Sequence, residues 1–201
     1  MKLIGTYFSP FSRRVAAALI ALGIPYEHDD LNGYKDPERA RQLNPVGKVP
    51  VLVLDSGEHL IDSAVILDYL DELVGTQRSL VPTAGEARRA MLQLAAISTT
   101  IYEQTTARDF EARRTQDCIQ PNLIERYRLQ TIGGLQALDA ASSLQGLIRK
   151  APLNLATISA VVAFEYAQML HPDLDAAAIA PSLARVVLDL GNEPAFQQTR
   201  P

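Results

Sequence analysis

The chain has 201 residues, of which 47% are hydrophobic and 21% charged, a composition that suits a globular protein with a sizeable core. Its formal net charge of −4 argues against nucleic acid as a main partner, because no basic field would hold a phosphate backbone. Met1 leads straight into a strand pattern without a secretory leader, and no apolar run is long enough to span a bilayer. We therefore predict a cytoplasmic protein without a membrane partner.

Cysteine and histidine usage argues against a disulfide or a metal centre. Cys118 is the single cysteine, which excludes an internal disulfide and a cysteine-only metal site. The three histidines, His28, His59 and His171, are scattered and show no metal-ligand spacing. We therefore predict a protein without a bound metal, in a reducing cytosol.

The first 75 residues alternate between strand and helix patterns. Gly23 and Gly75 end two apolar helical runs as C-terminal caps, and Asp36-Pro37 begins a third, shorter helix. An Asp-Ser-Gly turn joins two short apolar runs and predicts a hairpin. The expected order is βαβαββα, over residues 2–8, 12–23, 25–31, 36–44, the hairpin 49–61, and 62–75.

After Gly75 the character of the chain changes. Residues 76–86 carry turn residues without periodicity and are expected to form a linker. From about Glu86 onward only helical patterns are visible, over residues 86–114, 120–144, 154–170 and 181–201. The run 154–170 is almost wholly apolar, so we place it in the middle of a helical bundle. The sequence thus predicts an α/β domain over residues 1–75 and an all-helical domain over residues 86–201.

Two hydroxyls, Tyr7 and Ser9, stand just ahead of the first helix in "TYFSPFSRRV". A helix N-terminus exposes unpaired N–H groups and the positive end of its dipole, so it favours an anion. If the anion were a thiolate, hydroxyl and dipole together would lower its pKa from ~8.5 by about one to two units. The alternative is that Ser9 or Ser12 only caps the helix.

Two further motifs follow in the same half. Val49-Pro50, in "NPVGKVPVL", stands at the entrance of an apolar strand, where a cis bond would turn the backbone of Val49 toward an extended peptide ligand. Asp62-Ser63 stands at the start of the third helix and can grip an amino acid head group, Asp62 its ammonium and Ser63 its carboxylate. A loop-to-strand proline and a pair of helix caps are the alternatives.

In this order and spacing, the motifs resemble the glutathione transferase family, which has a thioredoxin-like βαβαββα domain followed by a helical bundle. The resemblance covers the whole chain and rests on "SPFSRRV", "NPVGKVPVL", "IDSAVILDYLDE" and the terminal "PSLAR…NEPAFQQTRP". It implies a cytosolic enzyme of the serine-type, bacterial-like kind that uses glutathione as co-substrate and activates its thiolate for attack on a small electrophile. It also implies a homodimer, which agrees with apolar residues on more than one face of two helices: Ala64, Val65, Leu67 and Leu70, and Met91, Leu92, Leu94, Ala95 and Ile97.

The resemblance assigns roles to residues of the first half. The Val49-Pro50 bond is expected to be cis, with Val49 paired to the cysteinyl backbone of glutathione. Asp62 and Ser63 would hold the γ-glutamyl end, and Lys48 would lie close to the glycyl carboxylate. In serine-type members the activating hydroxyl lies four residues before an arginine, which matches Ser9 and Arg13. In tyrosine-type members it lies near the end of the first strand, where Tyr7 stands, so Tyr7 is the alternative catalyst.

Residues on the electrophile side are less well marked. By analogy with the family, we name Phe11 after the first turn, and Tyr102, Arg108 and Phe110 on the long helix. The chain departs from the family in having Thr157 where an Asp commonly completes a capping box with the N-cap, here Asn154, and in having no Trp. A glutathione-dependent isomerase or dehalogenase, or a glutathione-binding module with little turnover, is the alternative function on the same scaffold.

Overall fold

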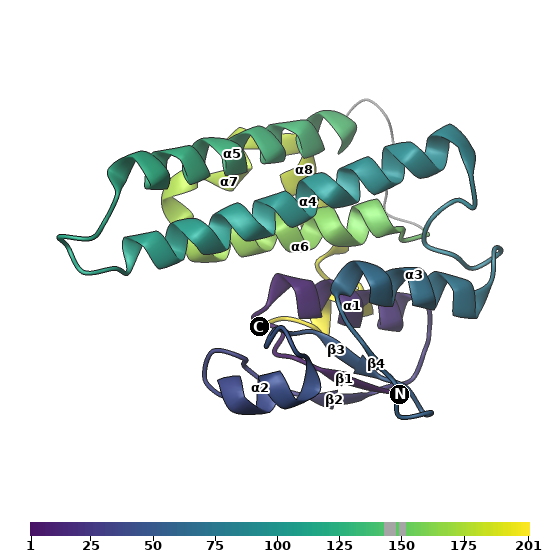
Figure 1. Cartoon of the computed structure of the whole chain (residues 1–201). Coiled ribbons are helices and arrows are strands. Elements are labelled where there is room, and N and C mark those ends of the chain that lie inside the picture. The colour runs from purple at the N-terminus through teal and green to yellow at the C-terminus, as the bar shows by residue number, and fades with distance from the viewer. Residues whose placement is uncertain (143–147, 149–151) are drawn as a thin grey trace. The chain divides into compact units, whose positions relative to one another are not determined.

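The computed structural model describes residues 1–142, 148 and 152–201 and divides into two compact units, each described by itself below (Figure 1). The first unit comprises residues 1–83 and 191–201, and the second comprises residues 84–190. The elements of the first unit are β1 (Lys2–Ile4), α1 (Pro10–Ala21), β2 (Glu27–Asp29), α2 (Pro37–Leu43), β3 (Val51–Val53), β4 (His59–Leu60), α3 (Ser63–Val74) and α9 (Pro194–Gln197). Up to α3 their order is the expected βαβαββα, and the predicted fold class is confirmed.

The sheet of the first unit has the order β2-β1-β3-β4. β1 pairs with β2 in parallel and with β3 antiparallel, and β3 and β4 form the expected hairpin. Because β3 runs against both β1 and β4, the end of β1, the start of β3 and the end of β4 lie at the same edge of the sheet. This edge is where the three sequence motifs stand.

Side chains of the central strands alternate between two faces of the sheet. Leu3 and Leu52 are register partners, both 0% exposed, on the face that α1 and α3 cover (Figure 1). Ile4 and Val51 are also partners, and they share a cluster with Ala40 of α2 on the opposite face. The period-two pattern of the strands therefore places one helical layer on each side of the sheet.

Two boundaries of the first unit differ from the expected ones. The first strand ends at Ile4 instead of residue 8, because Gly5 adopts a φ of +143° and a turn follows; Ser9 then caps α1, which starts at Pro10 instead of residue 12. Residues 191–201, expected in the helical domain, belong to the first unit, where α9 packs against α1 and buries Phe196 to 1% exposure.

Among its described residues, the second unit has helices joined by loops and no strand. It comprises α4 (Gly85–Ala112), α5 (Pro121–Ala140), α6 (Leu155–Leu170), the 3-10 helix η2 (Pro172–Leu174), α7 (Ala176–Ile179) and α8 (Pro181–Leu190). α4 packs against both α5 and α6, and all but a few residues of α6 are buried, as its apolar sequence predicts. Of the helix expected over residues 120–144, residues 143 and 144 lie outside the described residues.

The start of α6 explains how the chain manages without the family's usual Asp. Asn154 is the N-cap, and its side-chain oxygen accepts hydrogen bonds from the backbone N–H of Thr157 (2.9 Å) and from the Thr157 hydroxyl (3.2 Å). Both residues are buried. The N-terminus of α6 is therefore capped by the side chain of Asn154.

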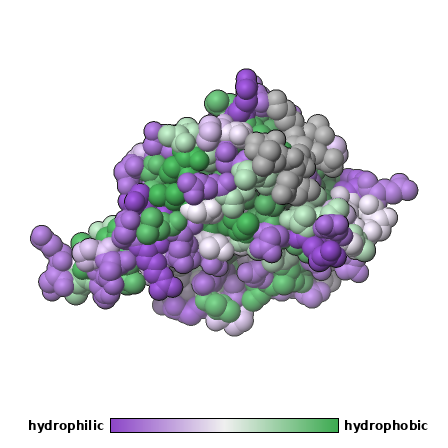
Figure 2. Space-filling model, turned by 90° about the horizontal axis from the view of Figure 1, so that it is seen from above, coloured by the Kyte–Doolittle hydropathy of each residue, from purple (hydrophilic) through white to green (hydrophobic). Residues whose placement is uncertain are grey.

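The surface mixes hydrophilic and hydrophobic residues, as the face in Figure 2 shows. Exposed large apolar side chains include Val65 and Leu73 of α3 and Leu92 of α4, two helices that we expected to carry surplus apolar residues. Among the helices described, none is long and apolar enough to cross a membrane. Among the residues that the structure describes, no cluster of three His, Cys, Asp or Glu side chains is placed to hold a metal ion.

Candidate functional site

Ser9 stands at the N-terminus of α1, at the sheet edge where the motifs meet. It is the N-cap residue, with Pro10 at the first helical position, and its Oγ accepts a hydrogen bond from the Ser12 backbone N–H at 3.4 Å. That distance is long for an N–H···O bond, and a hydroxyl that accepts still has a proton to donate. Capping the helix and donating to an anion are therefore compatible roles for Ser9.

Tyr7 lies in the turn before Ser9, and its side chain is engaged elsewhere. Its ring stacks on the imidazole of His28, with centroids 4.0 Å apart and planes 5° from parallel. Its hydroxyl is 2.9 Å from the hydroxyl of Tyr26. Burial and the hydrogen bond to Tyr26 raise the pKa of Tyr7 above its usual range, so the phenol stays neutral.

The Val49-Pro50 bond is cis, as expected. Within the described residues, neither the N–H nor the C=O of Val49 has a hydrogen-bond partner. Val49 lies beside the start of the turn that carries Ser9, since a Cβ added to Gly5 would be 3.0 Å from the Cβ of Val49. An unpaired backbone amide and carbonyl at this edge are suited to pair with an extended peptide.

Asn44, which was not among the predicted site residues, holds the loop in front of Val49. Its side chain donates to the Lys48 carbonyl at 2.8 Å and accepts from the Val46 N–H at 2.9 Å, and the residue is 4% exposed. The Asn44-Pro45 dipeptide, a common turn initiator, was the available signal. Lys48 itself is exposed, with its ammonium available to an acidic ligand.

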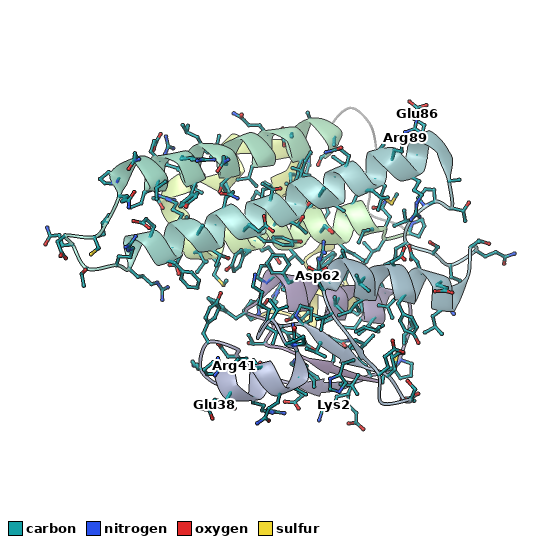
Figure 3. The ribbon with its side chains drawn as sticks, viewed as in Figure 1. Lys2, Glu38, Arg41, Asp62, Glu86 and Arg89 are labelled. Carbon is teal, nitrogen blue, oxygen red and sulfur yellow. The ribbon has the colours of Figure 1, made fainter. Side chains whose placement is uncertain are left out.

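Asp62 and Ser63 stand at the start of α3, where Figure 3 labels Asp62. Oδ1 of Asp62 caps the helix by accepting from the Ala64 N–H at 2.7 Å, and the residue is exposed. Ser63 is 1% exposed, and its Oγ accepts from Nε and Nη2 of Arg14 at 3.1 and 2.8 Å. Asp62 therefore caps α3 and keeps its second carboxylate oxygen for a ligand, while Ser63 is bonded to Arg14 and keeps its hydroxyl proton for a ligand.

Arg14 determines how the Ser63 hydroxyl points. A hydroxyl has two acceptor lone pairs and one proton, and Arg14 occupies both lone pairs of Ser63. Among the residues that the structure describes, none accepts the proton of Ser63. The pair is thus arranged as a hydrogen-bond donor with a buried positive charge behind it, which suits a carboxylate. The predicted motif contained Arg13, whereas its neighbour Arg14 is the residue bonded to Ser63.

Comparison with known proteins identifies the family. A family model described as "Glutathione S-transferase, N-terminal domain" matches residues 3–78. A solved glutathione transferase family member of Pseudomonas fluorescens Pf-5, with bound glutathione, is 30% identical and has a TM-score of 0.88, over 100% of this chain and 98% of that one. The chain belongs to the glutathione transferase family.

Two further relatives match over nearly the whole chain. The uncharacterized GST-like protein YibF of Escherichia coli (strain K12) is 28% identical, over 100% of this chain and 98% of the relative. A solved maleyl pyruvate isomerase, described as a bacterial glutathione S-transferase of the zeta class, is 25% identical with a TM-score of 0.82, over 99% of this chain and 96% of that one. This transferase family thus includes a relative described as an isomerase.

The residues that we predicted for the electrophile side fall into both units, and their structural roles differ. Tyr102 is 0% exposed, and its hydroxyl donates to the Ser159 carbonyl at 2.7 Å, which makes it a core residue of the second unit. Arg108 donates to Asp173 at 2.5 Å and thereby lowers the pKa of that carboxyl. Phe110 is 45% exposed, and Phe11 in the first unit is half-buried. Burial disfavours Tyr102 as a substrate contact and leaves Phe11 and Phe110 as the better apolar candidates.

Proposed function

We propose that this protein is a glutathione transferase that binds glutathione along the edge of the first unit and activates its thiolate for attack on a small electrophile. The observation that carries the proposal is the convergence of Ser9, Val49 and Ser63 at one edge of the sheet, each with an unused polar group. Hydrogen-bond donors and acceptors at one sheet edge suit a γ-glutamyl tripeptide, because its backbone and its carboxylates need such partners.

Each part of glutathione has a proposed partner. Asp62 would bind the α-ammonium of the γ-glutamyl residue, and Ser63, backed by Arg14, its carboxylate. The backbone of Val49, beside Pro50, would pair with the cysteinyl residue, and Lys48 would lie near the glycyl carboxylate. This assignment leaves the sulfur at the N-terminus of α1, where unpaired N–H groups and the helix dipole favour an anion.

Ser9 is the proposed thiolate activator. The thiol proton leaves to solvent, the Ser9 hydroxyl donates to the thiolate, and the sulfur attacks the electrophile. With an aryl halide, a carbon–sulfur bond forms and the halide departs. Within the first unit, Phe11 of α1 is the proposed neighbour of the electrophile, and Arg108 and Phe110 of the second unit stay predictions by analogy with the family. A homodimer in the cytoplasm remains the proposed state of the protein.

Ser9→Ala tests the assignment. We expect the pKa of the bound thiol to rise and conjugation of an aryl halide to slow at neutral pH, with the affinity for glutathione little changed. Ser12→Ala is the matched control, because Ser12 is 0% exposed and its Oγ has no hydrogen-bond partner among the described atoms. Ser9→Asn keeps a helix cap and separates the loss of the hydroxyl from the loss of capping. A fully active Ser9→Ala variant would refute Ser9 as the activator.

Isomerisation is the second candidate function, and it is supported by the similarity of the whole chain to a solved maleyl pyruvate isomerase. An isomerase returns glutathione unchanged, whereas a transferase consumes it. Following the thiol concentration during turnover of an aryl halide and of a cis-dicarboxylic enone therefore separates the two. Glutathione binding without turnover of either probe would instead indicate a binding module.

A further inference from the structure

Tyr7 makes two contacts on the β2 side of the sheet, and a hydrogen bond of His28 is linked to them. Its ring stacks on His28 at 4.0 Å, and its hydroxyl meets that of Tyr26 at 2.9 Å. His28 in turn donates from Nε2 to the Gly5 carbonyl at 2.9 Å, which lies at the start of the turn that contains Tyr7. The ring, the imidazole and the turn therefore form one closed set of contacts.

The direction of the Tyr7 side chain follows from the strand pairing. β1 and β2 are parallel, with Lys2 opposite Glu27 and Ile4 opposite Asp29. Tyr7 follows the end of β1, whereas Tyr26 precedes the start of β2. To stack on His28 and reach Tyr26, the Tyr7 side chain runs back along β2. It thus leads away from the edge where α1 begins.

The order of the strands also separates the Tyr7 hydroxyl from the proposed glutathione-binding residues. β2 lies on one side of β1, and β3 and β4, which carry Val49 and Asp62 at their ends, lie on the other. The Tyr7 hydroxyl is tied to the β2 side by Tyr26. Ser9, by contrast, stands at the N-terminus of α1 itself.

Backbone hydrogen bonds also hold the turn between β1 and α1. Gly5 and Thr6 donate to the carbonyls of Asp29 and Leu31, and the Ser9 N–H donates to the Thr6 carbonyl at 3.1 Å. Phe8, between them, is 44% exposed. Tyr7 thus fastens the middle of this turn to β2 through its side chain.

We propose that Tyr7, stacked on His28 and bonded to Tyr26, is a positioning residue that fixes the turn carrying Ser9, and is not a thiol activator. This inference rests on the proposed function only for its effect on the thiol. A hydroxyl held to one geometry donates to the sulfur without first losing conformational freedom, so fastening its turn increases the fraction of molecules ready to react. Loosening the turn should therefore affect the thiol indirectly and by a small factor.

The test compares Tyr7→Phe with Tyr26→Phe, since each removes one hydroxyl of the same hydrogen bond and leaves the rings in place. Tyr127→Phe, on α5 of the other unit, is the control. We expect the two variants to lower kcat/KM for an aryl halide by the same factor, about 2- to 12-fold, as the loss of one ordinary hydrogen bond does. The double variant should be no worse than either single one, because the bond is already broken. The bound thiol pKa should rise equally in both.

Amide hydrogen exchange of residues 6–12, measured without glutathione, gives a readout that does not need activity. We expect faster exchange in both variants and unchanged exchange in Tyr127→Phe. If Tyr7→Phe abolishes thiol activation while Tyr26→Phe retains it, Tyr7 is the activator and the inference is overturned. Unchanged exchange in Tyr7→Phe overturns it as well. A wild-type protein with no turnover would refute the proposed function alone, since amide exchange still tests whether Tyr7 fixes the turn.

Discussion

The two adjacent glycines of α5 offer a paired test of how closely α4 and α5 pack. A Cβ added at Gly134 would lie 2.6 Å from Cγ1 and 3.0 Å from Cδ1 of Ile101, whereas a Cβ at Gly133 would meet nothing within 4 Å. Ile101 is 0% exposed and β-branched, so its side chain has little freedom to move aside. Gly134→Ala therefore forces the two helices apart or strains Ile101, and Gly133→Ala does neither.

The expected magnitudes follow from two opposing effects. Both substitutions gain up to about 1 kcal/mol of helix propensity in an α-helix interior. Gly134→Ala also carries an overpacking cost of about 1–3 kcal/mol. We therefore expect Gly133→Ala to raise the free energy of unfolding by about 0.5–1 kcal/mol. The difference between the variants should be about 1–3 kcal/mol, or about 2–12 °C in Tm for a chain of this length.

Urea unfolding followed by circular dichroism, with equal protomer concentrations, measures both variants under the same conditions. A double-mutant cycle identifies the clash: Ile101→Ala alone should destabilise by about 2–5 kcal/mol, and Gly134→Ala added to it should cost less than in the wild type. Equal stability of the Gly133→Ala and Gly134→Ala variants would refute the reasoning. Strict additivity in the cycle would show that the cost, if present, does not come from Ile101.

Four further predictions concern the first unit and the assembly. Asp62→Ala should weaken glutathione binding about tenfold or more, because a charge-assisted contact is worth about 1.5–3 kcal/mol; an unchanged titration would leave Asp62 as a cap only. Gly5→Ala should lower Tm strongly, since the φ of Gly5 is +143° and the new Cβ would lie 2.4 Å from Oγ of Ser12. Gly23→Ala is the control, because Gly23 also has a positive φ but a Cβ there would meet nothing within 4 Å, so its loss of Tm measures the backbone cost without a clash. Arg39 and Lys2 hold the pKa of Asp29 below its usual range, so the stability that the Asp29 carboxylate contributes is present above that range and is lost as pH falls through the lowered pKa. The Tm of Asp29→Asn and of the wild type, measured against pH, should therefore converge in acid. A constant difference in Tm would contradict this. Sedimentation equilibrium at micromolar concentration should show a dimer, and a single species at 22.0 kDa would exclude it.

Local signals in the sequence were sufficient for the order of elements and for most of the proposed binding edge. Ser9, Asp62 and Asn154 are helix caps, and Val49-Pro50 marks a strand entrance, so each is recognisable from its immediate neighbours. The strands also reveal their two faces through a period of two, because side-chain direction alternates with each residue. These features depend on a few consecutive residues, and the sequence by itself determined them.

Contacts between residues far apart in the chain required the tertiary structure. The hydrogen bonds from Arg14 to Ser63 join residues 49 positions apart, and the sequence shows only two adjacent arginines, with nothing to say which one reaches Ser63. The contact between the Tyr7 and Tyr26 hydroxyls joins residues 19 positions apart, and nothing in the sequence indicates it. The packing of α9 on α1 likewise assigned residues 191–201 to the first unit. Periodicity specifies which face of an element is buried, but the identity of the partner depends on strand order and register, which only the folded chain determines.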